Sequence, residues 1–176
     1  KALTDQGTPV FYIHGNRDFL IGQLFSEQTG VTLLDEYSVI DLYGTSTLLT
    51  HGDLLCTDDL PYQAFRTKSH SAKWQENVLS KPLILRLLYA RWYRLRSYFH
   101  KRKKSQGIMD VNQQTITQIM QKYQTRRLIH GHTHRPAVHD LKIQGQTAQR
   151  FVLAEWKKDS ASLLSWSESG YKVEPI

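Results

Sequence analysis

The chain has 176 residues, one cysteine and a formal net charge of +7. This length is sufficient for one domain with a buried core, the apolar content of 40% is ordinary for a globular protein, and the single Cys56 excludes an intrachain disulfide. The charge is uneven, because residues 78–108 contain nine Lys or Arg and no Asp or Glu. Such a basic segment suits an anionic partner such as phosphate, nucleic acid or a membrane surface, or it is a solvated charged helix.

The first third of the chain predicts short strands separated by a helix. Phe19–Thr29 is helical in pattern and ends at Gly30. Bulky or alternating stretches predict strands on either side of it. These strands are Pro9–His14, Val31–Leu34, Tyr37–Tyr43 and Thr47–Thr50.

Residues 57–123 predict helices. Asp58 or Asp59 can cap the first of them, and Leu83–Phe99 has an apolar stripe interrupted by arginines, which excludes a membrane span. Asp110 is predicted to cap a further helix.

The last part of the chain predicts one more buried strand and then an antiparallel meander. A short strand, Arg127–Ile129, is followed by alternating segments with turns between them. These segments are Leu141–Ile143, Phe151–Trp156, Ser162–Trp166 and Tyr171–Val173. The fold class is therefore predicted to be α/β.

The dipeptide His-Gly occurs three times, each time directly after a predicted strand. Because strand ends in α/β sheets converge on one crevice, these positions bring four side chains together. Imidazole nitrogen and amide oxygen are suitable ligands for Mn, Fe or Zn. The candidate metal ligands are Asn16, His51, His132 and His134. The alternative is three unrelated turns that share a dipeptide.

The residues around these positions resemble the last three motifs of the calcineurin-like metallophosphoesterases. The matching stretches are Gly15–Asp18, Thr50–Asp53 and Gly131–His134. The resemblance implies a single domain over residues 1–176, a sandwich of mixed β-sheets with flanking helices, with a helical lid inserted at about residues 58–123.

The same resemblance implies a pair of Mn²⁺ ions. Carried over motif by motif, Asn16, His51 and His132 bind one ion and His134 binds the other. The remaining ligands of the family, including a bridging aspartate, belong to motifs that do not occur before Pro9. We therefore expect that the first β-α-β portion is absent and that these residues alone bind Mn²⁺ poorly and are inactive. His130 is expected to support the ligands or to close the strand.

Longer stretches resemble the branch of the family that acts on a UDP-diacylglucosamine lipid in lipid A biosynthesis. These stretches are residues 11–20, 51–59, 108–113 and 128–139. The resemblance implies Mn²⁺-dependent hydrolysis of the pyrophosphate at the α-phosphorus, which releases UMP. It also implies a monomer bound peripherally to the anionic, cytoplasmic face of the bacterial inner membrane, with no nucleic acid as partner.

Arg17 is the candidate catalytic residue. Its guanidinium is a poor general acid because its pKa is above about 12, but it can hold phosphoryl oxygens and stabilise the transition state. The leaving group is itself a phosphate, with a second pKa near roughly 6 as in phosphoserine, so it can depart without a proton donor. The alternative role is a surface ion pair with Asp18.

Further substrate contacts are implied by the resemblance, with Asn16, Arg17 and His132 among them. Asp59, Ser97, Lys101 and Lys104 complete the set, and the last three follow an i, i+4, i+7 spacing on one helix face. Asp59 has the alternative role of a helix cap. The apolar residues of the basic segment either line an acyl groove and touch the membrane or pack against other helices.

Two other functions fit the sequence. One is a non-catalytic basic module that binds nucleic acid through residues 86–104, whose aromatic side chains could stack on bases. The other is a calcineurin-like phosphodiesterase that acts on another nucleotide substrate. The three His-Gly strand ends argue against the first function, and the large apolar, basic insertion argues against the second.

Overall fold

The computed structural model describes residues 1–101 and 110–176, and for Arg96 and residues 98–101 it describes the backbone alone. The chain divides into two compact units. The sheet unit consists of Lys1–Leu55 and Val111–Ile176, and the helical unit consists of Cys56–Asp110.

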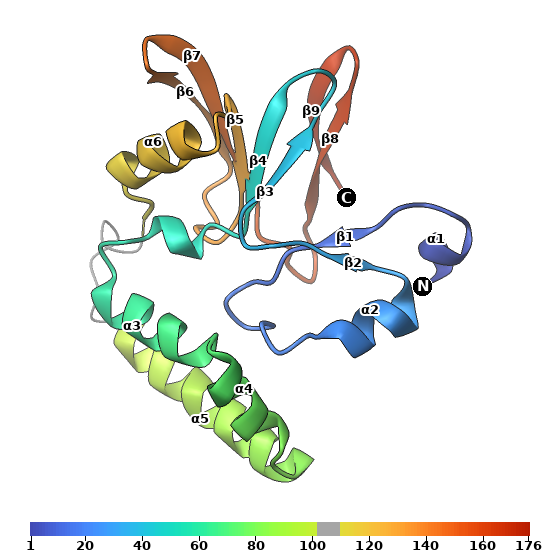
Figure 1. Ribbon diagram of the computed structural model, residues 1–176, viewed down its shortest axis with the longest axis vertical. Coiled ribbons are helices and arrows are strands. Elements are labelled where there is room, and N and C mark those ends of the chain that lie inside the picture. The colour runs from blue at the N-terminus through green and yellow to red at the C-terminus, as the bar shows by residue number, and fades with distance from the viewer. Residues whose placement is uncertain (102–109) are drawn as a thin grey trace. The chain divides into compact units, whose positions relative to one another are not determined.

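A five-stranded mixed sheet in the order β3-β4-β5-β7-β6 forms the centre of the sheet unit (Figure 1). The central strands β4, β5 and β7 run parallel, while the edge strands β3 and β6 pair antiparallel with β4 and β7. The strands are β3 (Ser38–Asp41), β4 (Ser46–Thr50), β5 (Arg127–His130), β6 (Ala137–Ile143) and β7 (Gln146–Val152). The carboxyl ends of β4 and β5 therefore meet at one edge of the sheet, as predicted from the sequence.

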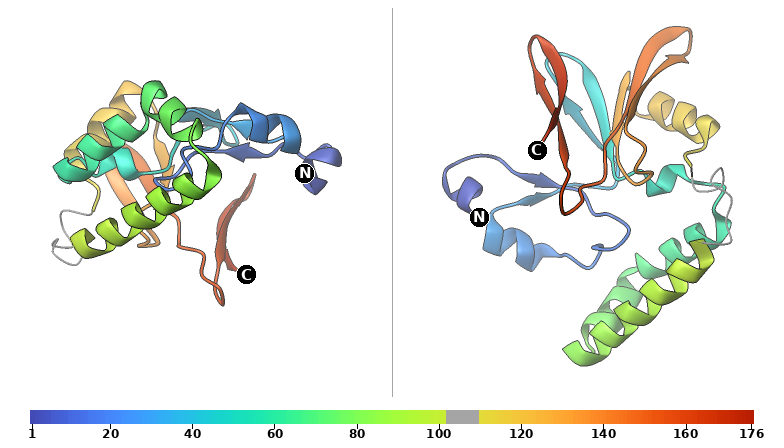
Figure 2. Two further views of the ribbon diagram at one scale, coloured as in Figure 1. Left: turned by 90° about the horizontal axis from the view of Figure 1, so that it is seen from below. Right: turned by 180° about the vertical axis from the view of Figure 1, so that it is seen from behind.

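The two faces of this sheet bury different side chains. Leu48, Leu128 and Arg150 are register partners along three neighbouring strands, so alternation places them on the same face. Helix α6 (Gln113–Lys122) lies beside β5 and the β6–β7 hairpin (Figures 1 and 2) and buries Ile116 and Met120.

Phe151 points to the opposite face, where an aromatic cluster holds a second hairpin. The hairpin consists of β8 (Ser162–Ser167) and β9 (Gly170–Pro175). The Phe151 ring lies 5.1 Å from Trp166 and 4.9 Å from Tyr171 in edge-to-face contacts. The guanidinium of Arg127 stacks over Trp166 at 4.7 Å from the ring centre, which ties the start of β5 to the hairpin.

The N-terminal part of the sheet unit contains a small parallel sheet and two helices. Strand β1 (Phe11–Tyr12) pairs with β2 (Thr32–Leu33), and the helices are α1 (Ala2–Asp5) and α2 (Gln23–Thr29). Helix α2 ends at Gly30 in a left-handed conformation with a φ of 74°. Strand β1 is shorter than the predicted Pro9–His14 because the chain after Tyr12 is held in a loop by side-chain hydrogen bonds.

The helical unit contains α3 (Leu60–Ser69), α4 (Ala72–Leu79) and α5 (Leu83–Lys101). Asp59 caps α3 by accepting a hydrogen bond from the Tyr62 amide at 3.1 Å. Helices α3 and α5 meet through Phe65 and Tyr93, whose ring centres are 5.2 Å apart. Helix α6, which the sequence analysis placed inside the insertion, belongs to the sheet unit.

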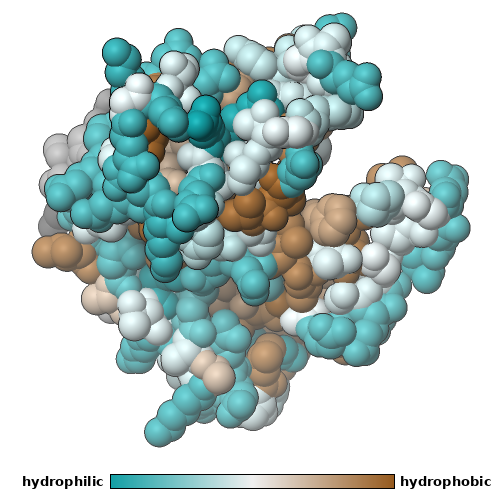
Figure 3. All heavy atoms as spheres, turned by 45° about the horizontal axis from the view of Figure 1, so that its top comes forward, coloured by the Kyte–Doolittle hydropathy of each residue, from teal (hydrophilic) through white to brown (hydrophobic). Residues whose placement is uncertain are grey.

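Many large apolar side chains of α5 are exposed. They include Leu83, Ile84, Leu87, Leu88, Trp92 and Leu95, with Ile84 69% and Trp92 50% exposed. Packing against described neighbours therefore does not account for the apolar stripe of this helix. Figure 3 shows one face of the molecule, where the surface is mostly hydrophilic and apolar residues gather near its middle. Within residues 1–101 and 110–176, none of the helices is long and apolar enough to cross a bilayer.

Three sequence predictions about elements were wrong. The cap of α6 is Asn112, whose side chain accepts from the Thr115 amide at 3.1 Å, and not Asp110. Helix α2 begins at Gln23 rather than Phe19, because Ile21 N donates to Asp18 O in a turn. The C-terminal meander is interrupted, since β7 ends at Val152 and β8 pairs with β9 alone among the described strands.

Candidate functional site

Two histidines meet at the carboxyl ends of β4 and β5. His51 directly follows β4, and His132 lies in the loop after β5. Nδ1 of His132 is 3.3 Å from Nε2 of His51, with the rings 5.2 Å apart and nearly perpendicular. The Gly131 amide donates to the His51 carbonyl at 2.9 Å, so the two loops are also joined through the backbone. We call this place the histidine edge.

The loop that carries Asn16 and Arg17 reaches the same place. The backbone of Gly15 lies so close to the His51 ring that a Cβ on Gly15 would be 3.1 Å from His51 Cε1. Three strand-end loops that are distant in sequence therefore meet, as the repeated His-Gly pattern predicted. Asn16 directly follows Gly15, whose backbone lies next to the His51 ring.

Asp18 fixes this loop from within. Its Oδ1 accepts a hydrogen bond from the Gly15 amide at 2.6 Å, and its Oδ2 accepts one from the Tyr12 hydroxyl. A second bond joins the two ends of this segment: His14 donates from Nε2 to the Ile21 carbonyl at 2.6 Å. The hydrogen bond from the Gly15 amide to Asp18 closes a short loop and leaves the two residues between them, Asn16 and Arg17, at its tip.

The neutral form of Tyr12 is favoured here. Partial burial, followed by the hydrogen bond to Asp18 and the negative charge of that carboxylate, raises the pKa of Tyr12 from 10.0 to about 12. Tyr12 consequently stays a hydrogen-bond donor to Asp18 throughout the physiological range of pH.

Arg17 stands free of the carboxylate next to it in sequence. Its side chain is exposed, and among the residues that the structure describes it makes no ion pair with Asp18. The oxygens of Asp18 accept hydrogen bonds from Gly15 and Tyr12 instead. This arrangement leaves the guanidinium available for a ligand.

His132 and His134 both have left-handed backbone conformations, with φ of 68° and 55°. Non-glycine residues in this region are uncommon and concentrate at binding sites. Nδ1 of His134 lies 3.6 Å from Oε1 of Glu155, which follows β7. Ligating histidines often turn their second ring nitrogen towards a carboxylate in this way.

The donors at the histidine edge suit a divalent cation. Two nitrogens that bind one ion at about 2.1 Å are separated by roughly 3.0–3.4 Å in tetrahedral or octahedral geometry, and the His51–His132 separation of 3.3 Å lies in that range. Within residues 1–101 and 110–176 there is no group of three His, Cys, Asp or Glu side chains that could hold a metal ion. The two imidazoles and the Asn16 loop could therefore supply part of a coordination shell.

The predicted substrate contacts of the helical unit are placed as follows. Asp59 acts as the cap of α3, which confirms the alternative role considered for it. Ser97 is exposed on α5, and Lys101 is the last residue of that helix. Lys104 lies outside the described residues. A substrate contact by any of these residues stays a prediction.

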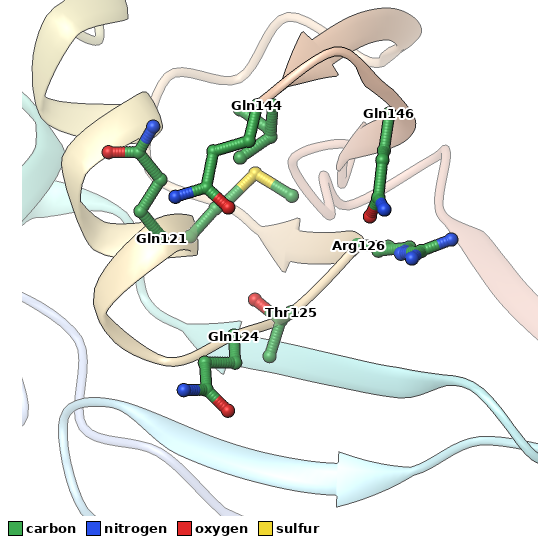
Figure 4. A pocket seen from close by; sticks show the side chains of 8 residues that line it. Gln121, Gln124, Thr125, Arg126, Gln144 and Gln146 are labelled. Atoms are coloured by element: carbon green, nitrogen blue, oxygen red, sulfur yellow. The ribbon is translucent and has the colours of Figure 1, made fainter.

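A hollow of about 320 Å³ lies away from the histidine edge, near the amino end of β5 (Figure 4). Glutamine, threonine and arginine side chains from the end of α6 and the β6–β7 turn line it, among them Gln121, Thr125, Arg126 and Gln144. Its lining contains no histidine or carboxylate, so it lacks the donors on which the histidine edge depends.

The profile of the calcineurin-like phosphoesterase family matches residues 1–136, which include the three loops of the histidine edge. The chain belongs to that family.

Curated relatives of this calcineurin-like chain align with it over most of its length. A protein of Salmonella typhi named UDP-2,3-diacylglucosamine hydrolase is 50% identical over 161 residues, which are 92% of this chain and 67% of the relative. A protein of the same name from Escherichia coli O81 is 49% identical over the same extent. The match to a solved structure of an archaeal phosphodiesterase covers 99% of this chain and 72% of that protein, with 9% sequence identity and a TM-score of 0.46.

The roles of two residues that shape this calcineurin-like site were not predicted from the sequence. Asp18 organises the Asn16 loop by accepting from the Gly15 amide, and its signal was a carboxylate in a predicted turn, where Asp side chains often bond to nearby backbone. Arg150 is a buried partner of His130. The sequence sign of this role was a charged residue that follows the same alternation as the buried Ala148 and Val152 along β7.

Proposed function

We propose that this chain carries the catalytic core of an enzyme that hydrolyses UDP-2,3-diacylglucosamine at the α-phosphorus. The products are UMP and 2,3-diacylglucosamine 1-phosphate (lipid X), and the reaction belongs to lipid A biosynthesis. The observation that supports this most is the pairing of His51 with His132 at 3.3 Å in a chain half identical to relatives of that name.

The proposed cofactor is a pair of Mn²⁺ ions. Asn16, His51 and His132 would hold one ion and His134 the other, with ligands beyond the present set completing both shells. Bound divalent ions supply Lewis acidity and an activated water to phosphoester hydrolysis. Glu155 would orient the His134 ring through the second nitrogen.

Arg17 is proposed to bind the phosphoryl oxygens. It sits at the tip of a loop held by Asp18, and its guanidinium can make two parallel hydrogen bonds to phosphate. Negative charge that grows on these oxygens in the transition state strengthens the same bonds. Asn16 and His132 would contact the same phosphate group.

The helical unit is proposed to bind the lipid. Its α5 helix combines exposed apolar side chains with Arg91 and Arg94, which are also exposed. Acyl chains suit the apolar residues, and anionic headgroups suit the arginines. Ser97, Lys101, Lys104 and Asp59 are the proposed contacts to the substrate headgroup. We also propose that the protein is a monomer bound peripherally to the cytoplasmic face of the inner membrane.

The reaction is tested with the whole protein that carries these residues, in water enriched in ¹⁸O. Attack at the α-phosphorus places the label in UMP and none in the lipid product. Label in the sugar phosphate, or a preference for simple nucleotide diesters over the UDP-lipid, would contradict the proposal and favour a nucleotide phosphodiesterase.

The metal site is tested with His51→Ala and His132→Ala. Each should lower both Mn²⁺ affinity and turnover by more than the roughly 10–100-fold seen for residues that only support a ligand. Gln121→Ala, on α6 and away from the histidine edge, is the control and should leave both unchanged. Mn²⁺ affinity that is equal in all four proteins would refute the proposed ligands.

A further inference from the structure

His130 is buried and hydrogen-bonded on both ring nitrogens. It ends β5 and is 1% exposed. Its Nε2 lies 3.2 Å from Nη1 of Arg150, a residue of β7 that is 5% exposed. Its Nδ1 lies 2.9 Å from the carbonyl oxygen of Gly131. Neither contact belongs to the proposed metal ligands themselves.

The two contacts together decide the tautomer of His130. A guanidinium has only N–H donors, so Nε2 of His130 must accept the hydrogen bond from Arg150. The ring proton is then on Nδ1, where it donates to the Gly131 carbonyl. Both contacts require the same tautomer, so Arg150 stabilises the form of His130 that provides the donor to Gly131.

The Gly131 carbonyl accepts the hydrogen bonds that hold the turn around His132. It accepts a second hydrogen bond from the Thr133 amide at 2.8 Å. The two donors hold the peptide on either side of His132, whose φ is 68°. In this conformation the His132 ring faces His51.

Gly52 leaves the space that this hydrogen bond needs. Its φ is 111°, and a Cβ at this position would lie 2.8 Å from His130 Nδ1 and 3.0 Å from the Gly131 carbonyl oxygen. A side chain at position 52 would therefore clash with both partners of the bond between His130 and Gly131.

We propose that Arg150 and His130 are positioning residues for the histidine edge. Arg150 fixes the Nδ1–H tautomer of His130, and His130 then fixes the turn that aims His132 at His51. The effect on metal binding rests on the proposed function, whereas the tautomer and the turn belong to the metal-free protein.

The first test is ¹⁵N NMR of the histidine rings in the metal-free, whole protein. His130 should show a protonated Nδ1 and an unprotonated Nε2, and Arg150→Met should convert it to a mixture of tautomers. A protonated Nε2 in the unchanged protein would overturn the inference, as would an Arg150→Met spectrum identical to it.

The second test uses two variants that each keep one of the two contacts. The asparagine amide reaches about as far as Nδ1, so His130→Asn retains the donor to Gly131. The glutamine amide reaches about as far as Nε2, so His130→Gln retains an acceptor for Arg150. Both replace a buried ring by a smaller amide, so a general loss of packing affects them alike.

His130→Asn should keep the His132 ring resonances of the metal-free protein and bind Mn²⁺ within about threefold of the unchanged protein. His130→Gln should shift those resonances and weaken Mn²⁺ binding by about 10–100-fold, as expected when a ligand loses its support. Equal behaviour of the two variants would overturn the inference. Absence of Mn²⁺ binding in the unchanged protein would instead refute the proposed function, and the ring resonances would still decide the role of His130.

Discussion

The histidine edge and helix α5 place residues by opposite means. At the edge, backbone and side-chain hydrogen bonds hold the loops, from the Gly131 amide on His51 to Asp18 on Gly15. On α5 the apolar side chains are exposed, and the helix supplies little beyond a regular spacing. Chemistry at a reacting phosphate requires fixed positions, whereas an acyl chain requires apolar area and tolerates many arrangements. On the proposed function, the two regions differ because their ligands do.

The comparison implies that point changes at the edge have large effects, and Arg17 should show the largest. Arg17→Ala should lower kcat by about 10²–10³-fold if the guanidinium stabilises charge in the transition state. Arg17→Lys should recover part of this, because it keeps the charge and loses the two-pronged geometry. Steady-state kinetics on the UDP-lipid measure both.

Arg126→Ala is the control for this series, since Arg126 is an exposed arginine near the amino end of β5. An Arg17→Ala enzyme as active as Arg126→Ala would remove Arg17 from the mechanism.

Gly52→Ala should have the next largest effect, because the added Cβ meets both His130 and the Gly131 carbonyl. Gly170→Ala is a matched control, since Gly170 has a similar φ of 123° with no atom within 4 Å of its added Cβ. Both variants carry backbone strain, so Gly52→Ala should be less stable by a further amount of about 1–3 kcal/mol from overpacking. Chemical denaturation measures the difference, and equal stabilities would show that the edge adapts more readily than its contacts indicate.

Changes on α5 should be smaller and graded. Arg91→Gln and Arg94→Gln should each weaken binding to anionic liposomes by about fivefold, which corresponds to about 1 kcal/mol per charge near a membrane. The loss should be additive and should disappear at high salt. Lys172→Gln, an exposed change on β9, is the control. Flotation that is insensitive to these charges would count against a membrane role for this helix.

Tyr12→Phe should have the smallest effect, and that effect should decline at high pH. Partial burial and the hydrogen bond to Asp18 raise the pKa of Tyr12 from 10.0 to about 12 in the folded state, so the protonated tyrosine contributes its full stability below pH 10. This contribution is lost as pH rises from 10 through 12. The difference in unfolding free energy between the two proteins should therefore shrink over that window. A difference that stays constant across it would show that Tyr12 ionises normally.

The pattern of residues in sequence predicted the convergence of the three loops but not what holds them. Strand ends of a parallel sheet meet by topology, so His51 and His132 could be placed together from spacing alone. The cap of α6 was misplaced because Asp110 and Asn112 are both suitable cap residues, and only the backbone geometry chooses between them. Arg150 was missed because its partner His130 lies on another strand, and cross-strand register cannot be derived from one strand's pattern.

The separation of β4 from β5 along the chain has a consequence for how the protein can vary. These strands pair directly, yet all of the helical unit is inserted between Thr50 and Arg127. The entropy of closing such a connection grows only with the logarithm of its length, by about 0.6 kcal/mol for each doubling. Relatives could therefore lengthen, shorten or rebuild the segment between these strands and change what they bind, while the two histidines keep their register.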